Sequence, residues 1–153
     1  MKNLDDTDLR ILRFVQKFGR LSNADLAEQV GLSTSACHRR LQRLENDNVI
    51  SSFVALIDAR SVNLRSTIFV EIKLLRQVDE VLEEFERAVC LIPEVLECHL
   101  MAGSADYLLK VVAKDTDDFE RIHRQYLSKL PNVSNMMSSF ALRTVFKSTA
   151  LPI

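Results

Sequence analysis

Residues 22–48, SNADLAEQVGLSTSACHRRLQRLENDN, contain two short helical patterns separated by a tight turn. Ser22 followed by Asp25 is the spacing of a capping box and predicts the start of the first helix. Gly31 is placed to end that helix, and Ser33 caps the next one after the turn Gly31-Leu32-Ser33. Two short helices joined this closely by a glycine-containing turn are typical of a helix-turn-helix.

The helix that follows Ser33 has one apolar face and one polar face. Cys37, Leu41 and Leu44 recur at helical spacing and are expected to pack inward. The opposite face carries hydroxyl, amide, imidazole and guanidinium groups, which donate to phosphates or read base edges in the major groove. We therefore predict a surface for double-stranded DNA made by Ser33, Thr34, Ser35, His38, Arg39, Arg40, Gln42 and Arg43. The alternative is a basic face that is merely solvated.

The segments on either side of this motif have their own signals. Residues 5–18 predict a first helix, with Asp5 as N-cap, Asp8 as the one polar residue on its apolar face, and Gly19 after its end. Asn48 stands where the third helix should end in a left-handed residue. Residues 49–58, VISSFVALID, are rich in β-branched and aromatic residues and predict a strand that leads out of the unit.

The rest of the chain predicts an α+β domain with the order strand, helix, strand, strand, helix, strand. The expected elements are residues 66–75, 79–92, 95–102, 106–113, 116–130, and a strand from Val133 into the 140s. This βαββαβ order is that of a ferredoxin-like domain. We expect a DNA-binding domain of the winged helix-turn-helix type over residues 1–50, a connecting segment over 51–64 and the ferredoxin-like domain over 65–153. The first strand alternates, with one set of side chains facing one way and the second set the other: Ile68, Val70, Ile72 and Leu74 against Thr67, Phe69, Glu71 and Lys73. The second set lies on the sheet face that the helices leave open, and we expect this face to be covered in a homodimer.

Composition limits the other possibilities. The net charge is −1, and residues 1–50 hold eight Lys or Arg against seven Asp or Glu, so a DNA-binding surface must be a local patch. The three widely spaced cysteines favour reduced, mostly buried thiols over a disulfide framework or a zinc site. We find no signal-peptide pattern and no long apolar run, and expect a cytoplasmic protein with no membrane partner. No nucleophile–base set, phosphate loop or metal-ligand cluster is evident, so we expect no enzyme and no cofactor.

Four segments together resemble the Lrp/AsnC family, also called the feast/famine regulators, over about residues 4 to 150. They are LDDTDLRIL (4–12), GRLSNADLAEQVGLSTSACHRRLQRLENDNVI (19–50), FVALID (53–58) and MAGSADYLLKV (101–111). The chain departs from the family's pattern at Asn48, where the family usually has Gly.

The resemblance implies a sequence-specific transcription regulator that binds DNA as a dimer, with dimers assembling into octamers. It also implies that an amino acid or related metabolite binds in the second domain, at contacts between dimers. The predicted effector site comprises Met101, Gly103, Ser104, Ala105, Asp106, Tyr107 and Ser138. Gly103 allows close approach of the backbone, Asp106 could accept hydrogen bonds from an ammonium group, and Tyr107 offers an aromatic wall. The alternative is a plain hairpin turn in which Asp106 caps its own backbone.

Three other functions stay open at this stage. Ferredoxin-like domains also occur in enzymes. A nucleoid-packing protein would bind DNA broadly and ignore metabolites. A metabolite-gated assembly could use its helix-turn-helix for protein contacts.

Overall fold

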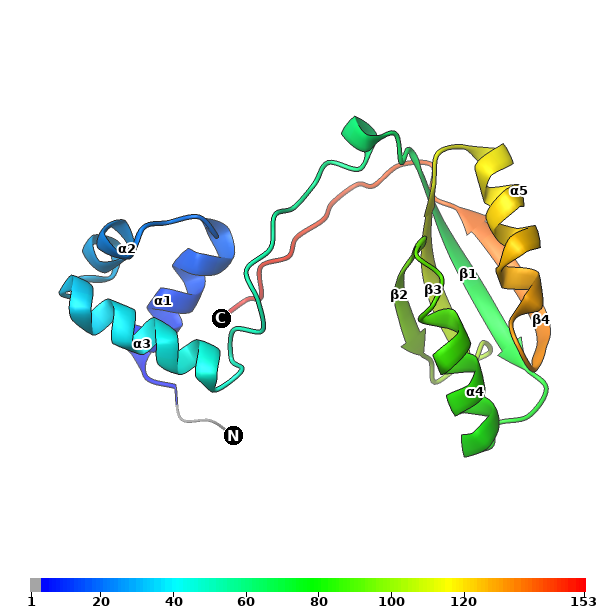
Figure 1. Ribbon diagram of the computed structural model, residues 1–153, viewed down its shortest axis with the longest axis horizontal. Coiled ribbons are helices and arrows are strands. Elements are labelled where there is room, and N and C mark those ends of the chain that lie inside the picture. Colours follow the sequence, from blue (N-terminus) through cyan, green and yellow to red (C-terminus); the bar gives the residue numbers. More distant parts are fainter. Residues whose placement is uncertain (1–3) are drawn as a thin grey trace. The chain divides into compact units, whose positions relative to one another are not determined.

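The computed structural model describes residues 4–153 and divides into two compact units (Figure 1). One unit is formed by Met1–Leu56 together with Val145–Ile153, and the other by Ile57–Thr144. The last residues therefore belong with the first unit, although the sequence pattern assigned all of 65–153 to the second domain. Hydrogen bonds hold them there: Gln16 exchanges two with the backbone of Leu151, both at 2.9 Å, and Arg13 Nε donates to the carbonyl of Ile153 at 2.6 Å.

The first unit contains three helices, α1 (Asp6–Lys17), α2 (Asn23–Val30) and α3 (Thr34–Asn46). Each begins at the predicted cap: Asp5, Ser22 and Ser33 accept hydrogen bonds from backbone N–H groups of the first turn. Gly31 ends α2 in the left-handed conformation, with φ of 69°, and Asn48 adopts φ of 52°. Because the backbone turns so sharply at Gly31, α3 starts directly after α2, as the helix-turn-helix prediction required.

The core of this unit confirms the predicted apolar faces. Its buried hydrophobic side chains are Ile11, Leu12, Leu26, Ala27, Val30, Cys37 and Leu44, with Leu41 partly buried beside them. Asp8 is the exception in this interior, since its side chain on α1 is only 1% exposed.

The strand predicted over residues 49–58 is wrong. Residues 51–58 form neither helix nor strand, and 51–57 make no backbone–backbone hydrogen bond within the described part of the chain. β-branched residues favour an extended backbone, but a strand also needs a partner for its N–H and C=O groups. The large side chains of this segment are exposed, among them Phe53, Val54, Leu56 and Ile57.

The second unit is a four-stranded antiparallel sheet with two helices. Its elements are η1 (Arg60–Val62), β1 (Ser66–Leu74), α4 (Asp79–Val89), β2 (Val95–Leu100), β3 (Tyr107–Ala113), α5 (Thr116–Gln125), η2 (Leu127–Lys129) and β4 (Val133–Phe140). The strands lie in the order β2-β3-β1-β4. This is the ferredoxin-like topology, with α4 and α5 packed on one sheet face (Figure 1). Both helices end earlier than the apolar pattern predicted.

Alternation along β1 decides which face carries the core. Ile68, Val70, Ile72 and Leu74 are buried against the helices, as predicted, while Phe69 is 39% exposed on the other face. Under α4, the rings of Phe85 and Tyr107 lie 4.6 Å apart. The expectation of mostly buried thiols is wrong, because Cys90 and Cys98 are exposed and only Cys37 is buried. No helix in residues 4–153 is both long and apolar enough to cross a membrane.

Candidate DNA-binding and ligand-binding sites

The start of α3 presents hydroxyl groups and free backbone donors. Ser33 Oγ accepts from the N–H of Ala36 at 3.3 Å and lies 3.4 Å from Ser35 Oγ. Thr34 and Ser35 are exposed. Because the first N–H groups of a helix have no partner within it, this end attracts an anion such as a phosphate.

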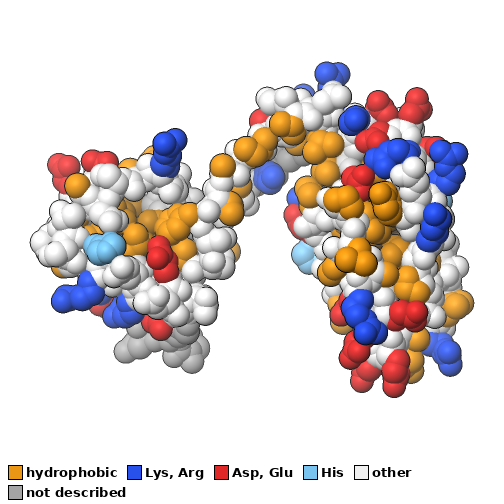
Figure 2. All heavy atoms as spheres, viewed as in Figure 1, with side chains coloured by type: hydrophobic (Ala, Val, Ile, Leu, Met, Phe, Trp, Pro, Cys, Tyr) orange, Lys and Arg blue, Asp and Glu red, His pale blue; other side chains and the backbone are white. Residues whose placement is uncertain are grey.

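The middle of α3 exposes the side chains that can reach a DNA groove. Arg39 and Gln42 are exposed, and Arg39 has no hydrogen-bond or ion-pair partner in residues 4–153. His38 is exposed as well, and its Nδ1 lies 3.0 Å from Nδ2 of Asn23 on α2. Figure 2 shows Lys or Arg side chains gathered on the visible face of this unit.

Two further arginines of α3 are held by acidic side chains at the N-terminal end of α1, namely its N-cap Asp5 and Asp8 in its first turn. Arg40 Nη1 donates to Asp5 Oδ2 at 2.7 Å and to Asp8 Oδ1 at 2.8 Å. Arg43 Nη2 donates to the other oxygen of Asp8. The hydrogen bond from Arg40 holds the pKa of Asp5 below its ordinary value, and the two carboxylates raise the pKa of Arg40. Sequence reasoning missed this pairing, although Asp8 on an apolar helix face was the signal.

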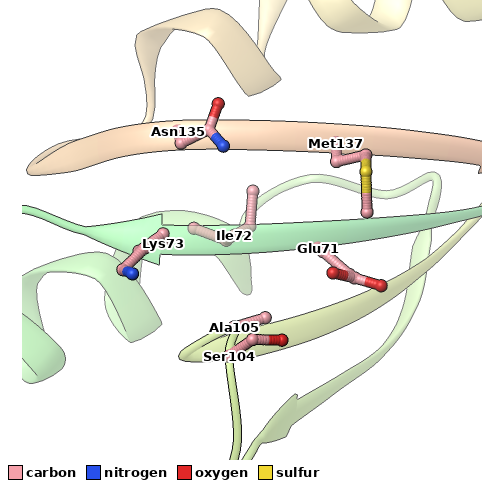
Figure 3. Close-up of a pocket in the computed structure, with 7 residues that line it drawn as sticks. All are labelled: Glu71, Ile72, Lys73, Ser104, Ala105, Asn135 and Met137. Atoms are coloured by element: carbon pink, nitrogen blue, oxygen red, sulfur yellow. The ribbon is translucent and has the colours of Figure 1, made fainter.

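On the open face of the second unit lies a pocket of about 220 Å³ (Figure 3). Three segments line it: β1, β4 and the loop before β3. Its residues are Glu71, Ile72, Lys73, Ser104, Ala105, Asn135 and Met137. In the β1–β4 register Glu71 is opposite Met137 and Lys73 is opposite Asn135, which places these side chains on one face. The pocket thus combines a carboxylate, an ammonium group and a polar loop, which suits a small zwitterion.

Ser104 and Ala105 of the predicted effector set line this pocket. The side chains of Asp106 and Tyr107 are instead buried and hydrogen-bonded within the domain. Asp106 is 6% exposed; its Oδ2 accepts from the N–H of Leu74 at 2.7 Å and its Oδ1 from Gln77 Nε2 at 2.5 Å. Tyr107 is 1% exposed and its hydroxyl donates to Glu86 Oε1 at 2.6 Å. Burial, followed by the bond to Glu86, raises the pKa of Tyr107. Both side chains are therefore bonded inside the domain and do not line the pocket.

The other predicted effector residues lie outside the pocket lining. Met101 is 43% exposed in the loop, and Gly103 has open space where a Cβ would be. Ser138 is paired with Val70, whose side chain is in the core, so Ser138 lies on the helix side of the sheet. The predicted effector set missed five lining residues, although the alternation of the first strand had already put Glu71 and Lys73 on the open face. The five are Glu71, Ile72, Lys73, Asn135 and Met137. No group of three or more His, Cys, Asp or Glu positioned to hold a metal ion occurs in residues 4–153.

These features define a two-domain protein that combines a helix-turn-helix with a small-molecule-binding α+β domain. The family model described as winged helix-turn-helix DNA-binding matches residues 4–51, and the Lrp/AsnC ligand binding domain matches residues 67–151. The chain is 37% identical over 153 residues to the Bkd operon transcriptional regulator of Pseudomonas aeruginosa, covering 100% of both chains. It is also 37% identical over 152 residues to the leucine-responsive regulatory protein of Escherichia coli K12, covering 99% of this chain and 93% of that protein.

Among solved structures, a transcriptional regulator from Neisseria meningitidis in complex with L-Met superposes with a TM-score of 0.92. It is 37% identical, and the match covers 98% of this chain and 97% of that one. The chain therefore belongs to the Lrp/AsnC family, and it is a DNA-binding transcriptional regulator with a ligand-binding domain.

Proposed function

We propose that this regulator binds an amino acid in the pocket on the open face of the sheet and that the bound amino acid alters its affinity for DNA. The observation that carries the proposal is the presence of Glu71 and Lys73 on one face, beside the polar loop at Ser104 (Figure 3). A carboxylate can accept from an α-ammonium group and a lysine can donate to an α-carboxylate. The leucine-responsive relative and the neighbour solved with L-Met support an amino acid as the ligand.

Titration calorimetry against each common amino acid tests this proposal. Lys73→Ala and Asn135→Ala should weaken binding of the amino acid that gives heat, because both remove polar groups from the lining. Ser138→Ala is the matched control: it changes the same strand, β4, on the helix side of the sheet, and should bind like the unaltered protein. Absence of heat with every amino acid would contradict the proposal and favour an architectural DNA-binding protein.

For the DNA interface, we propose that the polar face of α3 enters the major groove and contacts DNA through its exposed side chains, among them Arg39 and Gln42. The support is the exposure of Arg39 and Gln42 and of the hydroxyl residues Thr34 and Ser35 at the start of the helix. Arg39→Ala should lower the affinity for DNA. It should also reduce the slope of the logarithm of affinity against the logarithm of salt concentration by roughly 0.9, the contribution of about one phosphate contact. Arg124→Ala, an exposed arginine of α5, is the control. Equal binding by both variants and the unaltered protein would contradict this interface.

The working form we propose is a homodimer that assembles further, to an octamer. The support is the run of exposed apolar side chains at residues 53–57 and the exposed Phe69 on the open sheet face. Such surfaces are normally covered. Light scattering during gel filtration checks the assembly, and Phe69→Asp should shift it to smaller species. We propose that the protein acts in the cytoplasm, together with its DNA partner, and that it catalyses no reaction.

A further inference from the structure

Asp8 is a buried carboxylate that reaches two arginines of the DNA-facing helix. Its side chain, on α1, is 1% exposed. Oδ1 accepts from Arg40, and Oδ2 accepts from Arg43 and from the N–H of Asp5 at 3.1 Å. A buried carboxylate is tolerated only when charge and hydrogen bonds compensate it, so the loss of an arginine from Asp8 would be costly.

Arg40 and Arg43 differ in which of their N–H donors remain free to bind another anion. Arg40 is 29% exposed, and its Nη1 is shared between two carboxylates, Asp5 and Asp8. Moving the guanidinium group of Arg40 toward a DNA phosphate would break both ion pairs and leave the buried negative charge of Asp8 with fewer compensating partners. Arg43 is 49% exposed and gives only Nη2 to Asp8. Its Nε and Nη1 have no partner in residues 4–153 and remain available to an anion.

The exposed residues of α3 show which side chains are independent of Asp8. Ser35, Arg39 and Gln42 follow one another at i, i+4 and i+7, are exposed, and have no bond to α1. Arg40 lies beside this row, where α3 faces α1. The charge that α3 offers to DNA is therefore smaller than its four basic side chains suggest.

We propose that Asp8 is a positioning residue of the DNA interface: it withholds Arg40 from DNA and orients Arg43 so that the free edge of its guanidinium group meets a phosphate. This inference rests on the proposed role of α3 as the DNA-contacting helix. Asp8 thereby limits the sequence-independent part of DNA binding, which grows with each arginine that neutralises a phosphate. It favours discrimination between sequences over affinity for any duplex.

The first test compares Arg40→Gln with Arg39→Gln, the same change one position apart on α3. Each variant is titrated with two duplexes over a range of salt concentrations: one enriched from random sequence by the unaltered protein, and one scrambled version of it. We expect Arg39→Gln to reduce the salt slope by about one phosphate contact, roughly 0.9, and Arg40→Gln to leave the slope unchanged. A slope reduced equally by both variants would overturn the inference while leaving α3 as the interface. No effect of either variant would instead overturn the interface itself.

The second test is Asp8→Asn, which keeps the size of the side chain and removes its charge. We expect a steeper salt slope, tighter binding of the scrambled duplex, and a smaller affinity ratio between the two duplexes, because the arginines are released. A purely structural role of Asp8 would lower the melting temperature but leave slope and ratio unchanged, and that result would overturn the inference. Asp8→Glu, which retains the charge, should restore the ratio. Circular dichroism melts check folding, and if Asp8→Asn does not fold, the Arg39 and Arg40 comparison decides.

Discussion

Replacing Asp106 with alanine should destabilise the second unit rather than simply remove a ligand contact. In the structure Asp106 accepts from the buried N–H of Leu74 at 2.7 Å and from Gln77 at 2.5 Å. The alanine variant leaves the Leu74 N–H without its acceptor, and an unsatisfied buried donor costs about 1–3 kcal/mol. Gln77 is exposed, so water can replace the bond it loses. We therefore expect the free energy of unfolding to fall by about 2 kcal/mol, and by about 1 kcal/mol in Asp106→Asn, whose oxygen can still accept from Leu74.

Urea unfolding followed by tyrosine fluorescence measures this loss in the second unit alone. The chain has no tryptophan and two tyrosines, Tyr107 and Tyr126, which both belong to Ile57–Thr144. Ser104→Ala, in the exposed part of the same loop, is the control and should stay within about 0.5 kcal/mol of the unaltered protein. If Asp106→Ala has unchanged stability but no longer binds the amino acid, the carboxylate contacts the ligand and our interpretation of its geometry is refuted.

Three further outcomes follow from packing and titration. Phe85→Ala removes a fully buried ring that lies 4.6 Å from the ring of Tyr107. The free energy of unfolding should fall by about 3–5 kcal/mol in the same urea assay, and a loss below 1 kcal/mol would contradict this packing. The pKa of Asp5 is depressed by Arg40, so the folded first unit gains stability from this carboxylate above pH 3.8 and loses it as pH falls through the lower folded pKa. Asp5→Asn should flatten that acid dependence in circular dichroism, and an unchanged pH profile would argue against the pair. Although Cys98 as a residue is exposed, partial desolvation of its thiol, followed by the nearby Cys90 and Glu86, raises the pKa of that thiol to about 11. Alkylation of Cys98, mapped by mass spectrometry, should therefore be slow at neutral pH and accelerate toward pH 11; rapid modification at pH 7 would contradict this.

The helix-turn-helix could be predicted from sequence because its signals are local. Ser22, Ser33 and Gly31 act within a few residues of their own positions, through caps and a left-handed turn. The same holds for β1, where alternation separates Ile72 from Lys73 without knowledge of any neighbour. Local rules were insufficient at residues 51–57, whose β-branched side chains suit a strand but whose backbone has no hydrogen-bonded backbone partner within residues 4–153.

The amino-acid sequence by itself determined the order of elements, the apolar faces of helices and strands, and the family to which the chain belongs. Only the tertiary structure decided that Asp8 meets Arg40, that Asp106 holds the N–H of Leu74, and that Asn135 rather than Ser138 lies at the pocket. The physical reason is the range of the interactions. Capping and alternation act between near neighbours, whereas an ion pair between helices or the register of two strands depends on distant segments, and a shift of one residue moves a side chain to the opposite face.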